Sequence, residues 1–151
     1  MRYWLMKSEP SDLSIDDLAA TPDKTAAWTG VRNYQARNFM RDEMCVGDQA
    51  FFYHSSCAEP GIVGIVKVVK RAYPDETQFD RKSPYYDAKS SRQDPRWLNV
   101  DVKLVRKTRL VSIKELRGHP RLAQMRVLAK GNRLSITPVT EAEWSFIMKL
   151  V

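Results

Sequence analysis

The sequence has few of the residues that stabilise small secreted domains or bind metals. Among its 151 residues are only two cysteines and two histidines. Two cysteines cannot form a disulfide framework. The soft ligands show no paired CxxC or HxxxH spacing, and they are Cys45, His54, Cys57 and His119. The sequence therefore predicts neither a disulfide scaffold nor a metal site, and we expect no cofactor.

Long apolar runs are also missing. No stretch approaches the ~18 consecutive apolar residues that span a bilayer. The apolar stretch before Lys7 is too short for a signal peptide, and no small-residue cleavage site follows it. We expect a soluble intracellular protein with no membrane partner, cytoplasmic or, in a eukaryote, nuclear. Phosphate-binding glycine motifs (GxxxxGK[ST] or GxGxxG) are absent as well, which argues against a nucleotide-fuelled enzyme.

The composition is that of one globular domain. Apolar residues make up 43% and charged residues 28% of the chain, so a core can form. Charge is unevenly distributed along the sequence. Residues 1–60 hold six Lys/Arg and nine Asp/Glu, a net charge of −3, whereas residues 61–151 hold nineteen and nine, a net of +10. This asymmetry favours an anionic partner, nucleic acid above all, although a basic solvated surface would look the same.

Hydrophobic patterns predict a series of short strands. The apolar run Tyr3–Met6 and the aromatic run Gln49–His54 each read as a strand. Residues 61–69 are nearly unbroken Ile and Val, typical of a strand buried on both faces, with Gly64 marking a bulge or a close backbone approach. Alternation over Leu98–Leu104 predicts a half-buried strand, and a further short strand is expected at Leu134–Thr137.

Short helices are predicted between these strands. Capping signals at Ser14, Ser112 and Thr140 predict helices that begin just after them, those at Ser112 and Thr140 being complete capping boxes. A further helix is expected over Asn33–Arg41, and a helical turn from His119 to about Val127. Because strands and long helices do not alternate, we expect an α+β fold: a bent mixed sheet approaching a small barrel, with flanking helices.

The segment Thr77–Arg96 does not fit this scheme of strands and helices. It contains two prolines, adjacent tyrosines and five Lys/Arg between Arg81 and Arg96. A loop of this length is usually functional or disordered. Basic side chains mixed with Tyr85 and Tyr86 suit contacts with phosphates and bases, and a mobile solvated loop is the alternative.

The densest group of stacking and hydrogen-bonding side chains is Trp28–Asn38. Trp28 precedes a glycine-containing turn, so we expect it to project from a loop. Asn33 is placed either to cap the following helix or to present its amide to a base edge. Arg37 and Arg41 lie one turn apart and could hold a phosphate. In the strand Phe51–Ser55, alternate side chains face opposite ways, so we expect one set in the core and the other facing a cavity.

Several segments together resemble the EVE domain, a family of the PUA-like superfamily, and the resemblance covers nearly the whole chain. The segments that carry it are YWLMKSEP (3–10), WTGVRNYQARNFMR (28–41), GDQAFFYHS (47–55), GIVGIVKV (61–68), SPYYDAKSS (83–91) and GNRLSITPVTEAEW (131–144). The resemblance implies a single EVE (PUA-like) domain over residues 1–151. It also implies binding of DNA or RNA that carries a modified base, such as 5-methylcytosine or an oxidised form, without catalysis.

By this resemblance, a pocket would lie between the end of the first strand, the Trp28–Arg37 segment and the end of the Gln49–His54 strand. Trp28, Tyr34 and Tyr53 would form its walls. Polar or basic residues would contact base edges or phosphates, and these are Lys7, Ser8, Glu9, Asn33, Arg37, His54, Ser55, Tyr85 and Arg96.

Two alternatives stay open. One is an enzyme acting on a nucleotide or modified nucleobase, with His54 as acid or base and Cys57 as nucleophile. The other is a small-molecule sensor that uses the same pocket.

Overall fold

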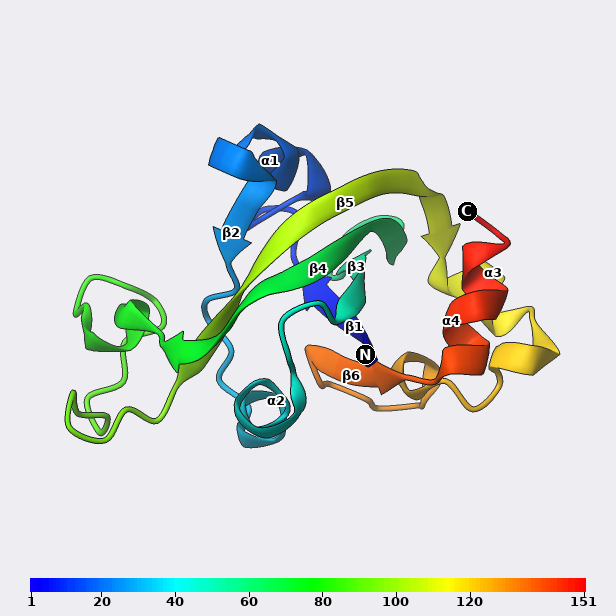
Figure 1. The fold of residues 1–151 in the computed structure, drawn as a ribbon. Coiled ribbons are helices and arrows are strands. Elements are labelled where there is room, and N and C mark those ends of the chain that lie inside the picture. Colours follow the sequence, from blue (N-terminus) through cyan, green and yellow to red (C-terminus); the bar gives the residue numbers. More distant parts are fainter.

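The computed structural model describes residues 1–151 and contains one mixed six-stranded sheet (Figure 1). The strand order is β2-β5-β4-β3-β1-β6. β1 pairs parallel with β3, and every other pair is antiparallel. The strands are β1 (Tyr3–Ser8), β2 (Thr25–Ala27), β3 (Gln49–His54), β4 (Gly61–Pro74), β5 (Leu98–Ser112) and β6 (Ile136–Val139).

The predicted α+β fold is confirmed. The sheet bends, as the arched β5 in Figure 1 shows, but its edge strands β2 and β6 do not pair, so no barrel closes. β4 and β5 run well beyond the predicted strands at 61–69 and 98–104, because each long strand supplies the other with hydrogen-bond partners. β2 is a strand that the sequence did not predict. The last strand lies two residues later than expected, at Ile136–Val139.

The helices are short and lie on both sides of the sheet. They are α1 (Ile15–Ala20), α2 (Tyr34–Asn38), α3 (Ile113–Arg117) and α4 (Glu141–Met148), with a π-helical turn at Phe39–Glu43 and 3₁₀ turns at Pro22–Lys24, Glu76–Phe79, Pro120–Leu122 and Arg126–Leu128. The helix predicted over 33–41 is thus an α-helix that changes to a π turn. No helix is long and apolar enough to cross a membrane.

The predicted helix caps form, with one difference. Thr140 and Glu143 make both bonds of a capping box at α4. The Ser112 hydroxyl accepts from the Glu115 N–H at α3, but the reciprocal bond is missing because the Glu115 carboxylate pairs with Arg109. The prediction of a complete capping box at Ser112 is therefore wrong.

Two hydrophobic cores cover the two faces of the sheet. On one face Trp4, Met6 and Phe52 pack with residues of α1, α2 and the π turn. On the other face Leu5, Phe51 and Tyr53 pack with α3, the 3₁₀ turns at 120–128 and α4. Both sets of alternating side chains in β3 are therefore in a core. The expectation that one set faces a cavity is wrong for Phe51 and Tyr53, because helical segments cover both faces of the sheet, but Ser55, just after the strand, does line a cavity.

Gly64 occupies the close approach that the sequence predicted. The register between β4 and β5 shifts between Ile62 and Gly64, which marks an irregularity in the ladder. A Cβ on Gly64 would lie 2.6 Å from Cδ1 of Ile15, at the start of α1. A Cβ here would force the Ile15 side chain to shift, so the glycine lets α1 pack closely on the sheet.

Candidate functional site

A cavity of about 410 Å³ opens where β1 ends. This volume lies in the range typical of small-molecule sites. The lining comes from five segments that are distant in sequence. They are the end of β1 and the following loop (Lys7, Ser8, Glu9, Asp12, Leu13), the segment after β2 with its last residue (Ala27, Trp28, Thr29, Gly30, Val31), Ser55 after β3, Tyr85, and Ser135 before β6. The topology therefore creates this site, since no two of these segments are adjacent in the chain.

Trp28 forms part of the cavity lining and is buried. Only 5% of the residue is exposed, and its ring meets that of Phe52 edge-on, with centroids 5.4 Å apart. The expectation that Trp28 projects from a loop is wrong, because its backbone N–H donates to the Val100 carbonyl and continues the β2–β5 ladder inward. The indole N–H has no acceptor within the protein and is not among the fully buried, unpaired polar atoms. It therefore keeps some access from outside.

Several polar groups of the lining are free to bind. The hydroxyls of Thr29 and Ser55 and the ammonium of Lys7 have no hydrogen-bond partner within the protein. The Ser8 hydroxyl donates to the Leu13 carbonyl at 2.6 Å and keeps its lone pairs as acceptors. Burial lowers the pKa of Lys7 from its ordinary value. The cavity thus combines apolar walls with donors and acceptors that no internal contact uses.

Tyr85 closes one side of this cavity. Its ring lies directly against Gly30, where a Cβ would come within 2.7 Å of the ring. Gly30 also has φ +83°, a conformation that favours glycine. The Tyr85 hydroxyl donates to an Asp12 carboxylate oxygen at 3.2 Å. Burial, followed by the charge of Asp12, raises the pKa of Tyr85. Tyr85 therefore connects two segments of the lining.

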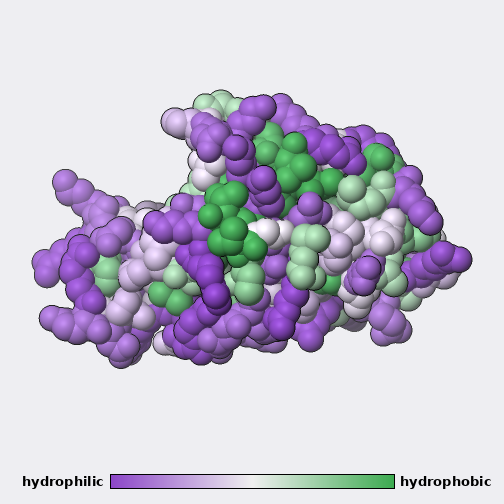
Figure 2. Space-filling model, viewed as in Figure 1, coloured by the Kyte–Doolittle hydropathy of each residue, from purple (hydrophilic) through white to green (hydrophobic).

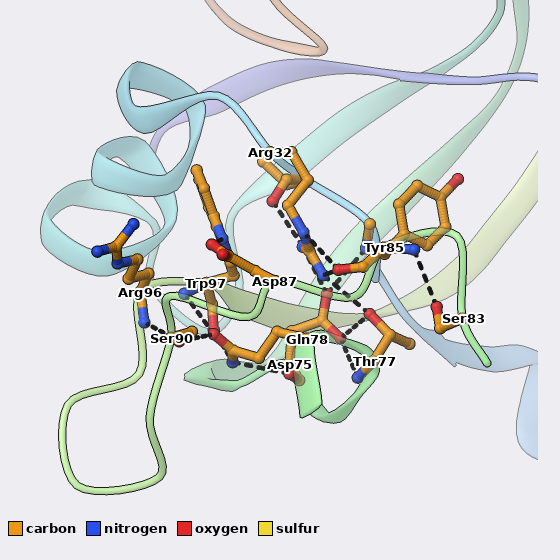
Figure 3. Close-up of polar contacts among 12 residues, drawn as sticks. Arg32, Asp75, Thr77, Gln78, Ser83, Tyr85, Asp87, Ser90, Arg96 and Trp97 are labelled. Carbon is orange, nitrogen blue, oxygen red and sulfur yellow. Dashed lines mark hydrogen bonds and ion pairs between the residues drawn. The ribbon is translucent and has the colours of Figure 1, made fainter. Parts of the chain in front are cut away.

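A buried ion pair holds the backbone of Tyr85 in position (Figure 3). Arg32 donates to the Tyr85 carbonyl through Nε at 3.1 Å and Nη2 at 2.7 Å, and to Asp75 Oδ2 at 3.1 Å. Asp75 is fully buried and also accepts from the N–H groups of Gly30 and Thr77. Burial alone would raise the pKa of Asp75, but the hydrogen bonds from Thr77, Gly30 and Arg32 together lower it. No local pattern in the sequence predicts this pair.

The Thr77–Arg96 segment is ordered by a second buried group, Gln78. Its amide nitrogen donates to the carbonyls of Asp75 and Trp97, and its oxygen accepts from the Ser90 hydroxyl and the Trp97 N–H (Figure 3). The segment begins with a 3₁₀ turn and then folds into successive hydrogen-bonded turns. The alternative of a mobile loop is therefore wrong. Figure 2 shows that its end of the molecule is mostly hydrophilic.

Four predicted site residues lie outside the cavity lining: Asn33, Tyr34, Arg37 and Arg96. The Asn33 side chain caps α2 by accepting from the Ala36 N–H. Tyr34 is half exposed, but Trp97 stacks on one side of its ring at 4.8 Å and the Arg37 guanidinium lies 4.7 Å from the ring centre. Arg37 also donates to the Arg96 carbonyl. These contacts attach α2 to the 77–97 segment.

Tyr53 and His54 also lie outside the lining. Tyr53 is 2% exposed and belongs to the core on the other face of the sheet. His54 accepts at Nε2 from the Ile15 N–H at 3.1 Å, so it fixes the start of α1. Burial lowers the pKa of His54, although nearby Asp16 opposes the shift. Cys57 is exposed, and no group of His, Cys, Asp and Glu gathers as a metal site would require.

Six of the twelve predicted residues therefore line the cavity, and they are Lys7, Ser8, Glu9, Trp28, Ser55 and Tyr85. Sequence reasoning missed the other seven lining residues, which are Asp12, Leu13, Ala27, Thr29, Gly30, Val31 and Ser135. Of the missed residues only Gly30 left a signal, as the glycine in the turn after Trp28. The others are ordinary residues that only the fold brings to the cavity.

Fold and cavity together define an α+β domain of the PUA-like type with one well-formed pocket at the end of its first strand. A family model described as "EVE domain" matches residues 2–150, and the chain belongs to this family. Thymocyte nuclear protein 1 of Gallus gallus is 49% identical, over 98% of this chain and 68% of the relative.

Solved structures agree with this assignment. The crystal structure of the human THYN1 protein in complex with 5-methylcytosine-containing DNA has a TM-score of 0.94 and 46% identity, covering 99% of this chain and 97% of that one. A crystal structure of a protein from Pseudomonas putida has a TM-score of 0.93 and 48% identity, covering 98% of both chains. The fold is thus shared in full with both.

Proposed function

We propose that this domain binds nucleic acid, DNA or RNA, and holds a single modified base in the cavity beside Trp28 without transforming it. The carrying observation is the cavity itself, with a tryptophan in its lining and unpaired polar groups beside it. The human relative, 46% identical, was crystallised with 5-methylcytosine-containing DNA, which supports the same class of ligand here.

The energetics of this binding are reasonable for one base. Turning a nucleotide out of its stack costs a few kcal/mol. Contact of the base with an aromatic ring returns about 1–3 kcal/mol. The Trp28 N–H and the Thr29 and Ser55 hydroxyls offer donors to the base edge, and both hydroxyls also accept. These groups supply the remaining free energy and the orientation.

Discrimination for a methyl group would be modest. Leu13, Val31 and Ala27 give the lining apolar surface for such a group. Burying one methyl contributes ~0.8 kcal/mol, which corresponds to about a four-fold difference in affinity. A larger preference is expected only for the oxidised forms, because their added oxygen could form a hydrogen bond with a free hydroxyl of the lining.

The enzyme alternative has less support. His54 and Cys57, the residues it would use, do not line the cavity, and the His54 Nε2 already accepts a backbone hydrogen bond. Incubation with modified oligonucleotides followed by mass spectrometry tests it directly. We expect unchanged masses, and any altered product would replace the reader function with an enzymatic one.

The decisive experiment blocks the cavity without disturbing the core. Ser55 is half-buried in the lining and its hydroxyl has no internal partner, so Ser55→Leu fills space that a base would use. Ser145→Leu, on the exposed face of α4, is the matched control. Affinity for oligonucleotides with cytosine, 5-methylcytosine or its oxidised forms is measured by fluorescence anisotropy, for single and double strands of DNA and RNA.

We expect the wild type and Ser145→Leu to prefer a modified base and Ser55→Leu to lose that preference. Equal preferences in all three proteins would contradict binding in this cavity. Tight binding of free nucleosides that does not change with salt would favour the sensor alternative, because phosphate contacts weaken steeply as salt rises.

A further inference from the structure

The two rims of the cavity differ in charge. On one rim Asp12, bonded to Tyr85, and the exposed Glu9 carry carboxylates. On the other rim the Lys7 N–H donates to the Ser135 carbonyl at 2.8 Å, and the Lys7 side chain has no acidic partner. A phosphate beside a base in the cavity would be repelled by the first rim and attracted by the second.

The second rim leads into a segment that contains no acid. Between Leu116 and Thr140 there is no Asp or Glu, and the five basic residues there are Arg117, Arg121, Arg126, Lys130 and Arg133. All five are exposed. None takes part in an ion pair, whereas the cations of β5 at Lys103, Lys107 and Arg109 are all neutralised by acids. These five side chains therefore keep their full charge toward solvent.

This segment is held in a fixed position, although it has little regular structure. Leu122, Met125 and Val127 are buried in the second core. The Asn132 side chain donates to the Arg126 carbonyl and closes the loop between them. In Figure 1 the segment runs in yellow and orange from α3 to the start of β6. Its cations are thus presented on a supported surface that ends at the cavity.

Arg117, at the other end of this surface, acts on Tyr53, which lies outside the cavity lining. Its charge acts on the Tyr53 hydroxyl, where it opposes the rise in pKa that burial causes. The Lys7 ammonium lies 5.9 Å from the centre of the same Tyr53 ring. Two cations without acidic partners, Lys7 of the cavity lining and Arg117, therefore lie near the buried Tyr53.

The Thr77–Arg96 segment, whose sequence predicts phosphate contacts, is a weaker candidate for this role. It holds five basic residues, but also Asp80, Asp87 and Asp94. One of its cations, Arg92, is paired with Glu76. Its charge toward a polyanion is therefore partly cancelled, unlike that of residues 117–133.

We propose that the phosphates flanking the bound base lie along the basic residues of 117–133, so that the nucleic-acid backbone leaves the cavity over this segment. This inference rests on the proposed function and adds to it the path of the strand. It attributes the part of the affinity that does not depend on base sequence to the basic residues of 117–133.

Two matched triple variants test this path. Arg126→Gln, Lys130→Gln and Arg133→Gln together remove three charges from the proposed path. Arg81→Gln, Lys82→Gln and Arg96→Gln remove three charges from the 77–96 segment, so the net charge of the two proteins is equal. Affinity for one modified duplex is measured over a series of salt concentrations, and binding of the modified nucleoside alone is measured in parallel.

We expect the 126/130/133 variant to bind the duplex at least about ten-fold more weakly than the wild type. The slope of log affinity against log salt concentration should become shallower by up to about 2.7, since each of the three phosphate contacts contributes about 0.9. The 81/82/96 variant should stay within about three-fold of the wild type. Nucleoside binding and base preference should be equal in all three proteins.

An equal or larger loss in the 81/82/96 variant would overturn the proposed path and leave base binding in the cavity intact. Failure of the proposed function would look different, because the wild type itself would then show no preference for a modified base. Circular dichroism and urea unfolding of both variants exclude a folding defect, which is not expected because none of the six residues is buried.

Discussion

The Tyr85 ring lies so close to Gly30 that no other residue at position 30 would leave it in place. The two residues are far apart in sequence, and their contact sets one wall of the cavity. Arg32, two residues after Gly30, holds the Tyr85 carbonyl, so backbone and side chain of Tyr85 are fixed from the same short segment.

Gly30→Ala should destabilise the domain by about 2–4 kcal/mol, from a strained positive φ together with displacement of the Tyr85 ring. Urea unfolding measures this loss. Gly131→Ala is the matched control, because Gly131 has φ +76° but nothing within 4 Å of its Cβ position. Gly131→Ala should lower the free energy of unfolding by only ~1–2 kcal/mol, the contribution of backbone strain.

Removing the ring separates the two effects in Gly30→Ala. In a Tyr85→Ala background, Gly30→Ala should lower the free energy of unfolding by about as much as Gly131→Ala does, because only backbone strain remains. If Gly30→Ala lowers the free energy of unfolding equally with and without the Tyr85 ring, the contact between Gly30 and Tyr85 does not constrain this wall of the cavity.

Arg32→Ala should destabilise the protein by about 3 kcal/mol, because it leaves the Asp75 carboxylate buried without its cation. Arg92→Ala is the control, since its ion pair with Glu76 is largely exposed and should contribute less than about 1 kcal/mol. Both are measured by urea unfolding, and equal losses would contradict the role of burial.

Lowering the pH should reduce the difference in stability between the wild type and Arg32→Ala. The pKa of Asp75 is lowered on folding, so its contribution to stability is present above the ordinary pKa of a carboxyl and is lost as pH falls below it. The gap between wild type and Arg32→Ala should therefore narrow in acid.

His54 should make the stability of the domain depend on pH near neutrality. Its pKa is lowered on folding, so below about pH 6.5 the unfolded chain binds a proton that the folded protein resists. Stability should be full above this pH and fall as the solution is acidified toward pH 5. Protonation would also remove the acceptor that Nε2 offers to the Ile15 N–H.

His54→Gln tests this dependence, because its side-chain oxygen can accept the same hydrogen bond without titrating. Urea unfolding at several pH values between 5 and 8 should give a flatter profile for the variant than for the wild type. Parallel profiles would mean that other groups cause the dependence.

The sequence by itself determined the local elements and the overall fold class. Apolar runs and alternation located β1, β3 and the first parts of β4 and β5, because side-chain burial imposes its period on the residues themselves. Capping residues located the starts of α1, α3 and α4 for the same local reason. The resemblance carried by residues 28–41 and the other segments identified the family.

The tertiary structure decided which of these residues meet. Trp28 is buried because an unpredicted strand, β2, pairs with β5, and Tyr34 has neighbours on its ring because the 77–97 segment folds back over α2. Asp12, Ser135 and the Arg32–Asp75 pair carry no local signal, because their roles depend on partners in other segments of the chain. Such contacts are set by strand pairing and packing across the whole chain, and no window of the sequence contains both partners.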